Sequence, residues 1–253
     1  MLQSTFTLKE NNRLTPSVHE LKLQGDCSAI TAPGQFVQVS VPGKFLRRPF
    51  SVCDVTDDVL TLCVRVSGEG TDALCALPVG TELDLLTGLG NGFDLAESSP
   101  LPLLIGGGSG VGALYGLAKA LLQRGRIVHA ALCFRTAEDV YYVNQFKALG
   151  AEVTVFTEDG SMGEEGNALF ALMLPHWDVF ACGPLGMLQA LDDACENPLQ
   201  LSLEARMGCG FGACMGCTIE TEDGPKRVCK DGPVFKGQTI VWPEENEEWG
   251  IRN

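Results

Sequence analysis

Four cysteines near the C-terminal end of the sequence constrain this chain more than any other feature. Cys209, Cys214 and Cys217 follow a C-x4-C-x2-C spacing, and Cys229 comes later in the same segment. Four thiolates at this spacing are typical of a plant-type [2Fe–2S] site, in which they hold two irons. The segment is therefore predicted to form a cluster loop with these four residues as its metal ligands.

The residues between these cysteines support the same interpretation. Glycine recurs through the loop, at Gly208, Gly210, Gly212 and Gly216. Because glycine has no side chain, the backbone can wrap closely and direct amide N–H groups at the sulfurs, which stabilises the negative charge of a cluster. A structural zinc site with four cysteine ligands is the alternative. Such sites usually contain two C-x2-C knuckles, and only Cys214 and Cys217 form one here.

The other cysteines favour a reducing compartment. The chain has 11 cysteines, an odd number, which is typical of cytosolic thiols rather than of a disulfide framework. Outside the loop they are scattered among mostly apolar neighbours, where a cysteine is usually a small buried side chain. These scattered residues are Cys27, Cys53, Cys63, Cys75, Cys133, Cys182 and Cys195. We therefore expect a cytoplasmic protein.

The length and net charge of the chain limit the classes of protein to which it can belong. A chain of 253 residues with 45% hydrophobic residues can form two compact domains and a small module. Its net charge of −14 and the lack of a basic stripe argue against a nucleic-acid partner. The N-terminus lacks the features of a signal peptide. No apolar stretch approaches the roughly 18 residues of a membrane span, so no membrane association is expected.

The hydrophobic pattern predicts a multi-domain chain with three units. From 1 to 97, short alternating runs such as 36–41 and 59–66 are separated by glycine turns, which favours an antiparallel β-barrel. From 98 to 198, strands alternate with helices, which predicts an α/β nucleotide-binding domain with a parallel sheet. The third unit, 199–253, is the small module that carries the cysteine loop. Within the α/β unit we expect strands at 101–105, 127–134, 152–156 and 179–182, and helices at 113–123, 137–149 and 185–194.

Two segments of the predicted barrel could bind a flavin nucleotide. The tetrapeptide Arg48-Pro49-Phe50-Ser51 lies on a strand, where an arginine can pair with a diphosphate and a serine can hydrogen-bond a flavin ring. The segment 68–71, Gly-Glu-Gly-Thr, precedes a helical stretch, and a glycine turn at a helix N-terminus suits a pyrophosphate. Taken alone, the first segment also fits a surface arginine beside a proline turn. The second also fits a plain turn with a threonine cap.

A glycine-rich turn opens the predicted α/β unit. The segment 106–113 contains Gly108-x-Gly110-x-x-Ala, the permitted variant of the dinucleotide fingerprint, between a strand and a helix. The acidic ribose ligand expected about 20 residues later is absent, and the chain instead reads Phe-Arg-Thr at 134–136. A later strand ends in Cys-Gly-Pro at 182–184, at the edge where a parallel sheet binds ligands. That tripeptide also fits a simple strand–helix turn.

Taken together, these segments resemble the electron-transfer subunits of class B dihydroorotate dehydrogenase, within the ferredoxin-reductase superfamily. The resemblance covers nearly the whole chain. The segments that carry it are 48–51, 68–71, 89–93 (Leu-Gly-Asn-Gly-Phe), 106–110, 157–160 (Thr-Glu-Asp-Gly), 181–184, 202–207 (Ser-Leu-Glu-Ala-Arg-Met) and the cysteine segment that ends at 235. The glycine turn of the family commonly carries a proline where this chain has Gly112 or Ala113.

The resemblance implies FAD, a [2Fe–2S] cluster and NAD as an exchangeable substrate. FAD would be bound by Arg48, Pro49, Phe50, Ser51, Cys63, Val64, Arg65, Gly70 and Thr71. The nicotinamide nucleotide would dock near Gly106, Gly108, Gly110 and Cys182. The cluster would be held by Cys209, Cys214, Cys217 and Cys229.

The resemblance also implies a partner. A separate FMN-containing catalytic subunit would oxidise dihydroorotate to orotate in pyrimidine biosynthesis, in a heterotetramer with this chain. The present chain would pass electrons from that FMN through the cluster and FAD to NAD+, and no catalytic residue of its own is predicted. One alternative is a flavin and iron–sulfur NAD(P) reductase subunit of a hydrogenase- or ferredoxin-linked complex. The other is a zinc-stabilised binding module without a redox cofactor.

Overall fold

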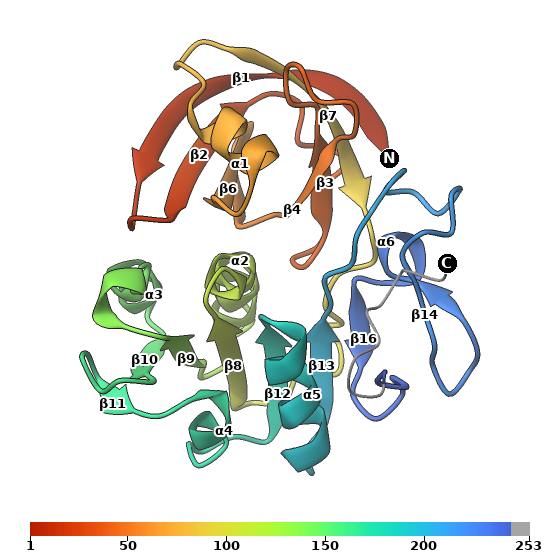
Figure 1. Ribbon diagram of the computed structural model, residues 1–253. Helices are drawn as coiled ribbons and strands as arrows, with labels where there is room; N and C mark the ends of the chain where they lie inside the picture. The colour runs from red at the N-terminus through yellow and green to blue at the C-terminus, as the bar shows by residue number, and fades with distance from the viewer. Residues whose placement is uncertain (244–253) are drawn as a thin grey trace.

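In the computed structural model, which describes residues 1–243, a curved sheet lies above a flatter sheet that is covered by helices (Figure 1). The N-terminal segment, red to yellow, forms the upper part, and the following segment, green to teal, forms the lower part. The blue C-terminal segment lies beside both. The last part of the predicted unit 199–253 falls outside the described residues. None of the helices within 1–243 has the length and apolar character needed to span a bilayer.

The upper sheet is antiparallel, with strand order β4-β3-β7-β1-β2-β6-β5. Its elements are β1 (Leu2–Arg13), β2 (Val18–Gln24), β3 (Phe36–Val39), β4 (Arg48–Ser51), β5 (Asp54–Thr56), β6 (Val59–Arg65) and β7 (Glu82–Leu89), with helix α1 (Glu69–Cys75) between β6 and β7. In β6, Leu60, Leu62 and Val64 are buried in the core of this sheet. Because side chains alternate along a strand, Cys63 and Arg65 face the other way. The predicted β-barrel architecture is confirmed as a curled antiparallel sheet.

The lower sheet has strand order β11-β10-β9-β8-β12-β13-β16 and is parallel except at β16. Its strands are β8 (Pro102–Gly107), β9 (His129–Phe134), β10 (Glu152–Thr157), β11 (Glu164–Glu165), β12 (Asp178–Cys182), β13 (Leu199–Ser202) and β16 (Val234–Lys236). Its helices are α2 (Gly110–Gln123), α3 (Val143–Leu149), α4 (Ala168–Ala171) and α5 (Leu185–Ala194).

Helices on both faces explain the apolar character of these strands. Every residue of β8 and β12 is buried, as expected for a parallel sheet that is covered on both sides. Side chains of α2 and α3 pack in one hydrophobic cluster, and those of α4 and α5 pack in another on the opposite face. The predicted α/β fold is confirmed, and α5 spans the predicted range 185–194.

The helix predicted over 137–149 is wrong in its first half. A short 3-10 turn, Ala137–Asp139, is separated from α3 by a break at Tyr142, whose φ of 66° is left-handed. Tertiary hydrogen bonds hold this break. The Tyr142 hydroxyl donates to the Glu20 carboxylate of β2 at 2.6 Å, and the Tyr141 hydroxyl reaches the glycine turn before α2.

The cysteine-rich segment is joined to the lower sheet. After β13, the chain passes through the cysteine loop, the short hairpin β14 (Thr218–Ile219) and β15 (Lys226–Arg227), and helix α6 (Val228–Asp231). It then returns as β16, which pairs antiparallel with β13. Buried Cys217 and Cys229 share a hydrophobic cluster with Phe36 of the upper sheet and Leu201 of β13. The segment therefore packs against both sheets, and the division into three units at 97 and 198 stays a prediction.

Candidate functional site

The four loop cysteines are held in two pairs by backbone amides. The N–H groups of Ala213 and Cys214 donate to the Cys209 Sγ at 3.2 and 3.4 Å, and the Cys209 N–H donates to the Cys214 Sγ at 3.5 Å. The Cys229 N–H donates to the Cys217 Sγ at 3.4 Å. Among residues 1–243, no group of three or more His, Cys, Asp or Glu side chains lies close enough together to hold a metal ion. Two pairs of thiols with amide donors suit a centre that contains two irons.

These amides also change the chemistry of one thiol. Burial opposes ionisation of Cys209, but the N–H groups of Cys214, Phe211 and Ala213 outweigh it and lower the thiol pKa to about 6. By contrast, burial and the neighbouring Cys217 thiol raise the pKa of Cys229 to about 12. Thiolates bind iron, so the loop offers one thiol, Cys209, that is ready to ligate and another, Cys229, that must lose its proton as metal binds.

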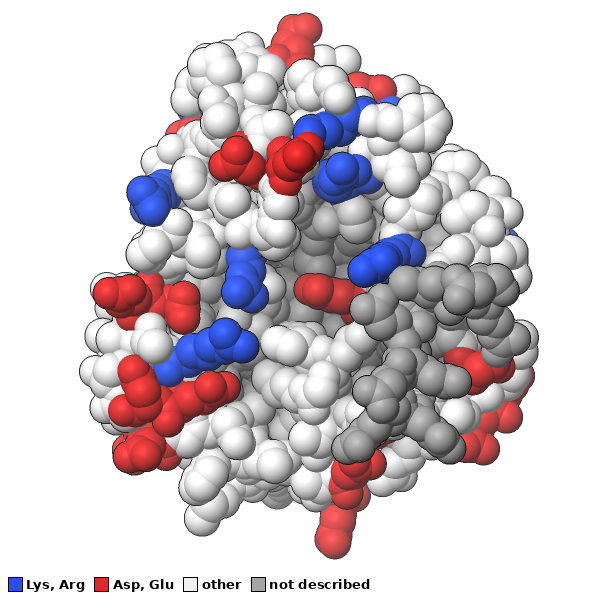
Figure 2. Space-filling model, in the orientation of Figure 1, with Lys and Arg blue, Asp and Glu red and all other residues white. Residues whose placement is uncertain are grey.

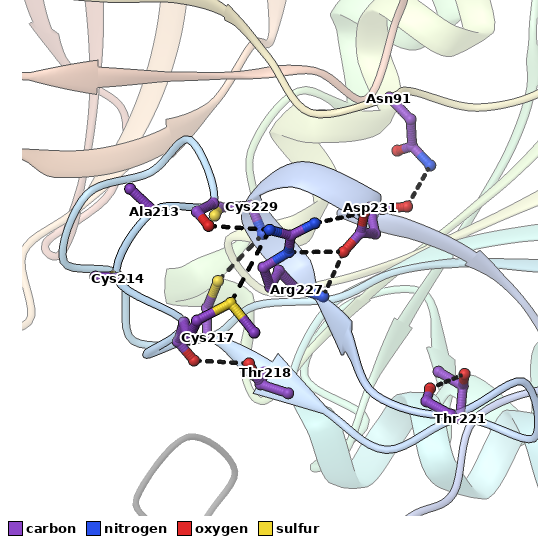
Figure 3. Close-up of polar contacts among 12 residues, drawn as sticks. Asn91, Ala213, Cys214, Cys217, Thr218, Thr221, Arg227, Cys229 and Asp231 are labelled. Carbon is purple, nitrogen blue, oxygen red and sulfur yellow. Dashed lines mark hydrogen bonds and ion pairs between the residues drawn. The ribbon is translucent and has the colours of Figure 1, made fainter.

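Arg227 fixes the shape of the loop (Figure 3). Its guanidinium donates to the Asp231 carboxylate at 3.0 Å and to the Gly212 carbonyl at 3.0 Å. Gly210 and Gly212 have φ values of 78° and 91°, which only glycine adopts without strain. The backbone conformation therefore favours glycine at these two positions, and the role of the loop glycines in directing amide N–H groups at a cluster stays a prediction.

The structure brings together the two predicted flavin segments of the upper sheet. The Arg48 guanidinium of β4 lies over Gly70 at the start of α1, so that a Cβ on Gly70 would be 2.5 Å from the Arg48 Nε. In this structure that guanidinium donates only to the carbonyls of Leu46 and Arg47, among the described residues. An arginine above a glycine turn can pair with a diphosphate. This arrangement fits the phosphates of FAD.

The side chains of two predicted flavin residues make contacts within the protein and are not free to bind a flavin. The Thr71 hydroxyl accepts hydrogen bonds from the N–H groups of Ser67 and Gly68 and donates to the Gly68 carbonyl, so it closes its own turn. The Val64 side chain is fully buried in the core of the upper sheet. The adjacent residue, Arg65, by contrast lines a cavity.

This cavity, of about 420 Å³, lies between the upper sheet and the carboxyl ends of the lower strands. Figure 2 shows a hollow between the upper and lower parts of the molecule, with basic side chains at its rim. Ligands of open α/β sheets bind at the carboxyl ends of the strands, so this is the expected nucleotide position. The lining residues include Ser17, Val18 and Arg65 at the upper sheet; Gly107, Gly108, Phe134, Arg135, Asp139, Tyr141 and Glu158 at or after the ends of β8, β9 and β10; Asn167, Ala168 and Leu169 at α4; and Pro184, Gly186 and Met187 at α5.

Of the predicted nucleotide residues, only Gly108 lines the cavity itself. Gly106 and Gly110 lie beneath the turn, where added Cβ atoms would meet Val111 at 2.9 Å and the Cys182 carbonyl oxygen at 2.2 Å. The Cys182 side chain is buried, which raises the pKa of its thiol to about 12. Gly106 therefore lets α2 approach β8 and Gly110 lets it approach β12, as the last glycine of the dinucleotide fingerprint does.

Tyr141 is a site residue that the sequence pattern does not identify. Its hydroxyl accepts a hydrogen bond from the Gly112 N–H at 3.2 Å and lies 3.1 and 3.2 Å from the carbonyls of Gly108 and Ser109. The tyrosine thus closes the glycine turn from below. Across the turn, a Cβ on Gly112 would be 2.7 Å from the Cys63 Cβ, so the glycine turn also touches β6.

Comparison with known proteins agrees with this geometry. Residues 204–241 match the family described as the iron–sulfur cluster binding domain of dihydroorotate dehydrogenase B. The dihydroorotate dehydrogenase B (NAD(+)) electron transfer subunit of Geobacillus sp. (strain WCH70) is 40% identical over 256 residues, which cover 95% of this chain and 99% of that protein. The subunit of the same name from Bacillus caldolyticus is 41% identical over 251 residues, covering 93% and 97%. The chain belongs to this family of electron transfer subunits.

A solved structure extends the likeness over the fold. The NADH-dependent reduced ferredoxin-NADP oxidoreductase structure, described for flavin-based electron bifurcation, superposes with a TM-score of 0.86 at 27% identity, covering 94% of this chain and 90% of that chain. Membership of the dihydroorotate dehydrogenase B family confirms the predicted family, the ferredoxin-reductase-like fold and the role in electron transfer within an oxidoreductase. The assignment of individual flavin and nucleotide residues stays a prediction.

Proposed function

We propose that this subunit passes electrons from an FMN-containing catalytic subunit that oxidises dihydroorotate, through a [2Fe–2S] cluster and FAD, to NAD+. Cys209, Cys214, Cys217 and Cys229 would hold the cluster, and Arg48 with the turn at Gly70 would hold the phosphates of FAD. When bound, a flavin supplies the exchange between hydride transfer and single-electron transfer. The protein supplies the spacing and orientation of these groups.

The observation that supports this proposal most directly is the position of the upper sheet between the other two sites. On one side, Phe36 of β3 belongs to the same hydrophobic cluster as Cys217 and Cys229. On the other side, Cys63 of β6 contacts Gly112 of the glycine turn. A flavin on this sheet would therefore lie between the cluster loop and the nucleotide cavity, which is the order that the electron path requires.

The exposed edge of the cluster loop would face the catalytic subunit. Cys214 is the exposed cysteine of the four, and the neighbouring side chains of Phe211 and Met215 are 44% and 53% exposed. Exposed apolar side chains beside a redox site are typical of a protein interface. The family resemblance implies a heterotetramer with two copies of each subunit, which takes part in pyrimidine biosynthesis in the cytoplasm.

The proposal can be tested on the anaerobically purified subunit by its visible spectrum, with iron, zinc and flavin quantified on the same sample. We expect about two irons per chain together with FAD, and bleaching of both chromophores on addition of NADH. Dihydroorotate should bleach neither the cluster nor the flavin of the isolated subunit. After the catalytic subunit is added, dihydroorotate should bleach both. Zinc without flavin would contradict the proposal, as would an NADH-insensitive spectrum.

Replacing Arg48 by glutamine should weaken FAD binding. The substitution removes a charged donor above Gly70, and a hydrogen bond to a charged group contributes about 1.5–3 kcal/mol, or roughly a 10- to 100-fold change in the FAD dissociation constant. The measurement is fluorescence titration of the flavin-free protein with FAD. Arg47→Gln is the matched control, because the Arg47 guanidinium is bonded to the Asp84 carboxylate and carbonyl. Equal FAD affinities in the two variants would argue against the assignment of Arg48.

A further inference from the structure

A buried amide lies at the junction of the upper sheet and the cluster loop. Gln38 of β3 is 0% exposed, and neither its Nε2 nor its Oε1 has a hydrogen-bond partner within residues 1–243. Buried amides are normally bonded, because an unpaired polar group in the interior costs free energy. The other buried glutamines follow this rule: Gln35 and Gln200 each use both amide atoms in hydrogen bonds. The amide of Gln38 is therefore the exception among the buried glutamines of the described chain.

The strand pattern directs this amide out of the core of the upper sheet. Val37 and Val39 pack inside that core, and Gln38, between them, faces the opposite side. Phe36, on the same face as Gln38, belongs to the same hydrophobic cluster as Cys217 and Cys229. The face of β3 that carries Gln38 is thus the face that meets the cysteine segment.

The amide reaches the cluster loop at Gly210, the residue after Cys209. A Cβ on Gly210 would be 2.4 Å from the Gln38 Nε2 and 2.7 Å from its Cγ, so only glycine leaves room for this side chain. On the sheet side, Gln38 pairs with Pro49 of β4, within the predicted flavin segment. The polar end of Gln38 therefore lies between the flavin strand and the cluster loop.

We propose that the Gln38 Nε2 donates a hydrogen bond to a sulfur of the bound cluster and thereby raises its reduction potential. The inference rests on the proposed function, since it requires a cluster in the cysteine loop. The sulfurs of such a cluster are hydrogen-bond acceptors, and their negative charge increases when the cluster takes up an electron. A donor beside them stabilises the reduced form more than the oxidised form, so removing the donor lowers the potential.

The test is the substitution Gln38→Met, which keeps the length of the side chain and removes its polar atoms. We expect the variant to contain the same iron and FAD as the wild-type subunit. The equilibrium constant for one-electron reduction of its cluster should fall about tenfold, which corresponds to about 59 mV. The FAD potential should not change. The potentials are measured by a redox titration of the loaded subunit, with the cluster followed by electron paramagnetic resonance and the flavin by absorbance.

Two further variants separate an effect on the cluster from a general effect on stability. Gln200→Met removes a bonded amide in β13 and is expected to lower stability without moving the cluster potential. Gln38→Glu keeps the shape but presents a carboxylate, and it should lower the cluster potential as well, with a larger decrease at high pH where the carboxylate is ionised. An unchanged cluster potential in an iron-loaded Gln38 variant would overturn the inference, and so would a shift confined to the flavin. Absence of iron from the wild-type subunit would overturn the proposed function instead.

Discussion

Replacing Cys217 by serine is expected to abolish cluster assembly and to leave FAD binding largely intact. Cys217 is 2% exposed, and its sulfur accepts the Cys229 N–H, so its position is fixed before metal binds. A serine hydroxyl stays protonated at neutral pH and lacks the soft sulfur that iron–sulfur centres use. The variant should lose its iron and the visible absorption of the cluster. Iron analysis and the flavin released by heat denaturation measure the two sites separately.

The matched control is Cys195→Ser, at another buried cysteine. The Cys195 Sγ lies 3.6 Å from the Asn197 carbonyl oxygen, so a serine hydroxyl there has an acceptor within reach. We expect this variant to retain iron and FAD at wild-type levels. Loss of FAD together with iron in Cys217→Ser would contradict the separation of the two sites, because the predicted flavin residues lie on the upper sheet and in α1.

Replacing Gly110 by alanine is expected to destabilise the subunit by about 3 kcal/mol or more, at the upper end of the cost of overpacking. An added Cβ would lie 2.2 Å from the oxygen and 2.4 Å from the carbon of the Cys182 carbonyl. Both atoms are backbone at the end of β12, so neither can move away as a flexible side chain would. Helix α2 must then shift, and the cavity beside Gly108 should lose affinity for NADH. Denaturant unfolding and an NADH titration of flavin absorbance measure the two effects.

Gly186→Ala provides the comparison for this effect. Gly186 lies within α5 at the same cavity, and a Cβ there would meet nothing within 4 Å. Alanine should stabilise the helix by up to about 1 kcal/mol because it has the higher helix propensity. A Gly110→Ala protein that is as stable as the wild type would show that the close approach of α2 to β12 is not needed for folding.

Local patterns in the sequence predicted most of the framework. The alternation over 59–66 became β6 because one face of that strand is buried in the core of the upper sheet. The helix over 185–194 formed as predicted because its apolar positions recur at helical spacing and pack on one face of the lower sheet. The cysteine spacing also predicted the iron–sulfur domain, since the ligands of such a loop lie close together in sequence.

Features that depend on distant contacts could not be read from the same patterns. Tyr141 lies in a stretch with helical composition, and only the folded chain shows that its hydroxyl closes a turn at Gly112. The left-handed break at Tyr142 depends on Glu20 of another sheet. The unpartnered amide of Gln38 becomes visible only when the cluster loop packs against β3. In each case the deciding neighbour is far away in the sequence.

The pairing of β13 with β16 has a consequence for electron transfer through the subunit. The segment that carries the cysteines leaves the lower sheet at Ser202 and returns to it at Val234, and these two residues are ladder partners. A segment anchored at both ends to adjacent strands cannot swing between donor and acceptor as a tethered carrier domain does. The fold thus fixes the distance between the proposed cluster site and the proposed flavin site, and electron transfer between them would need no movement of a domain.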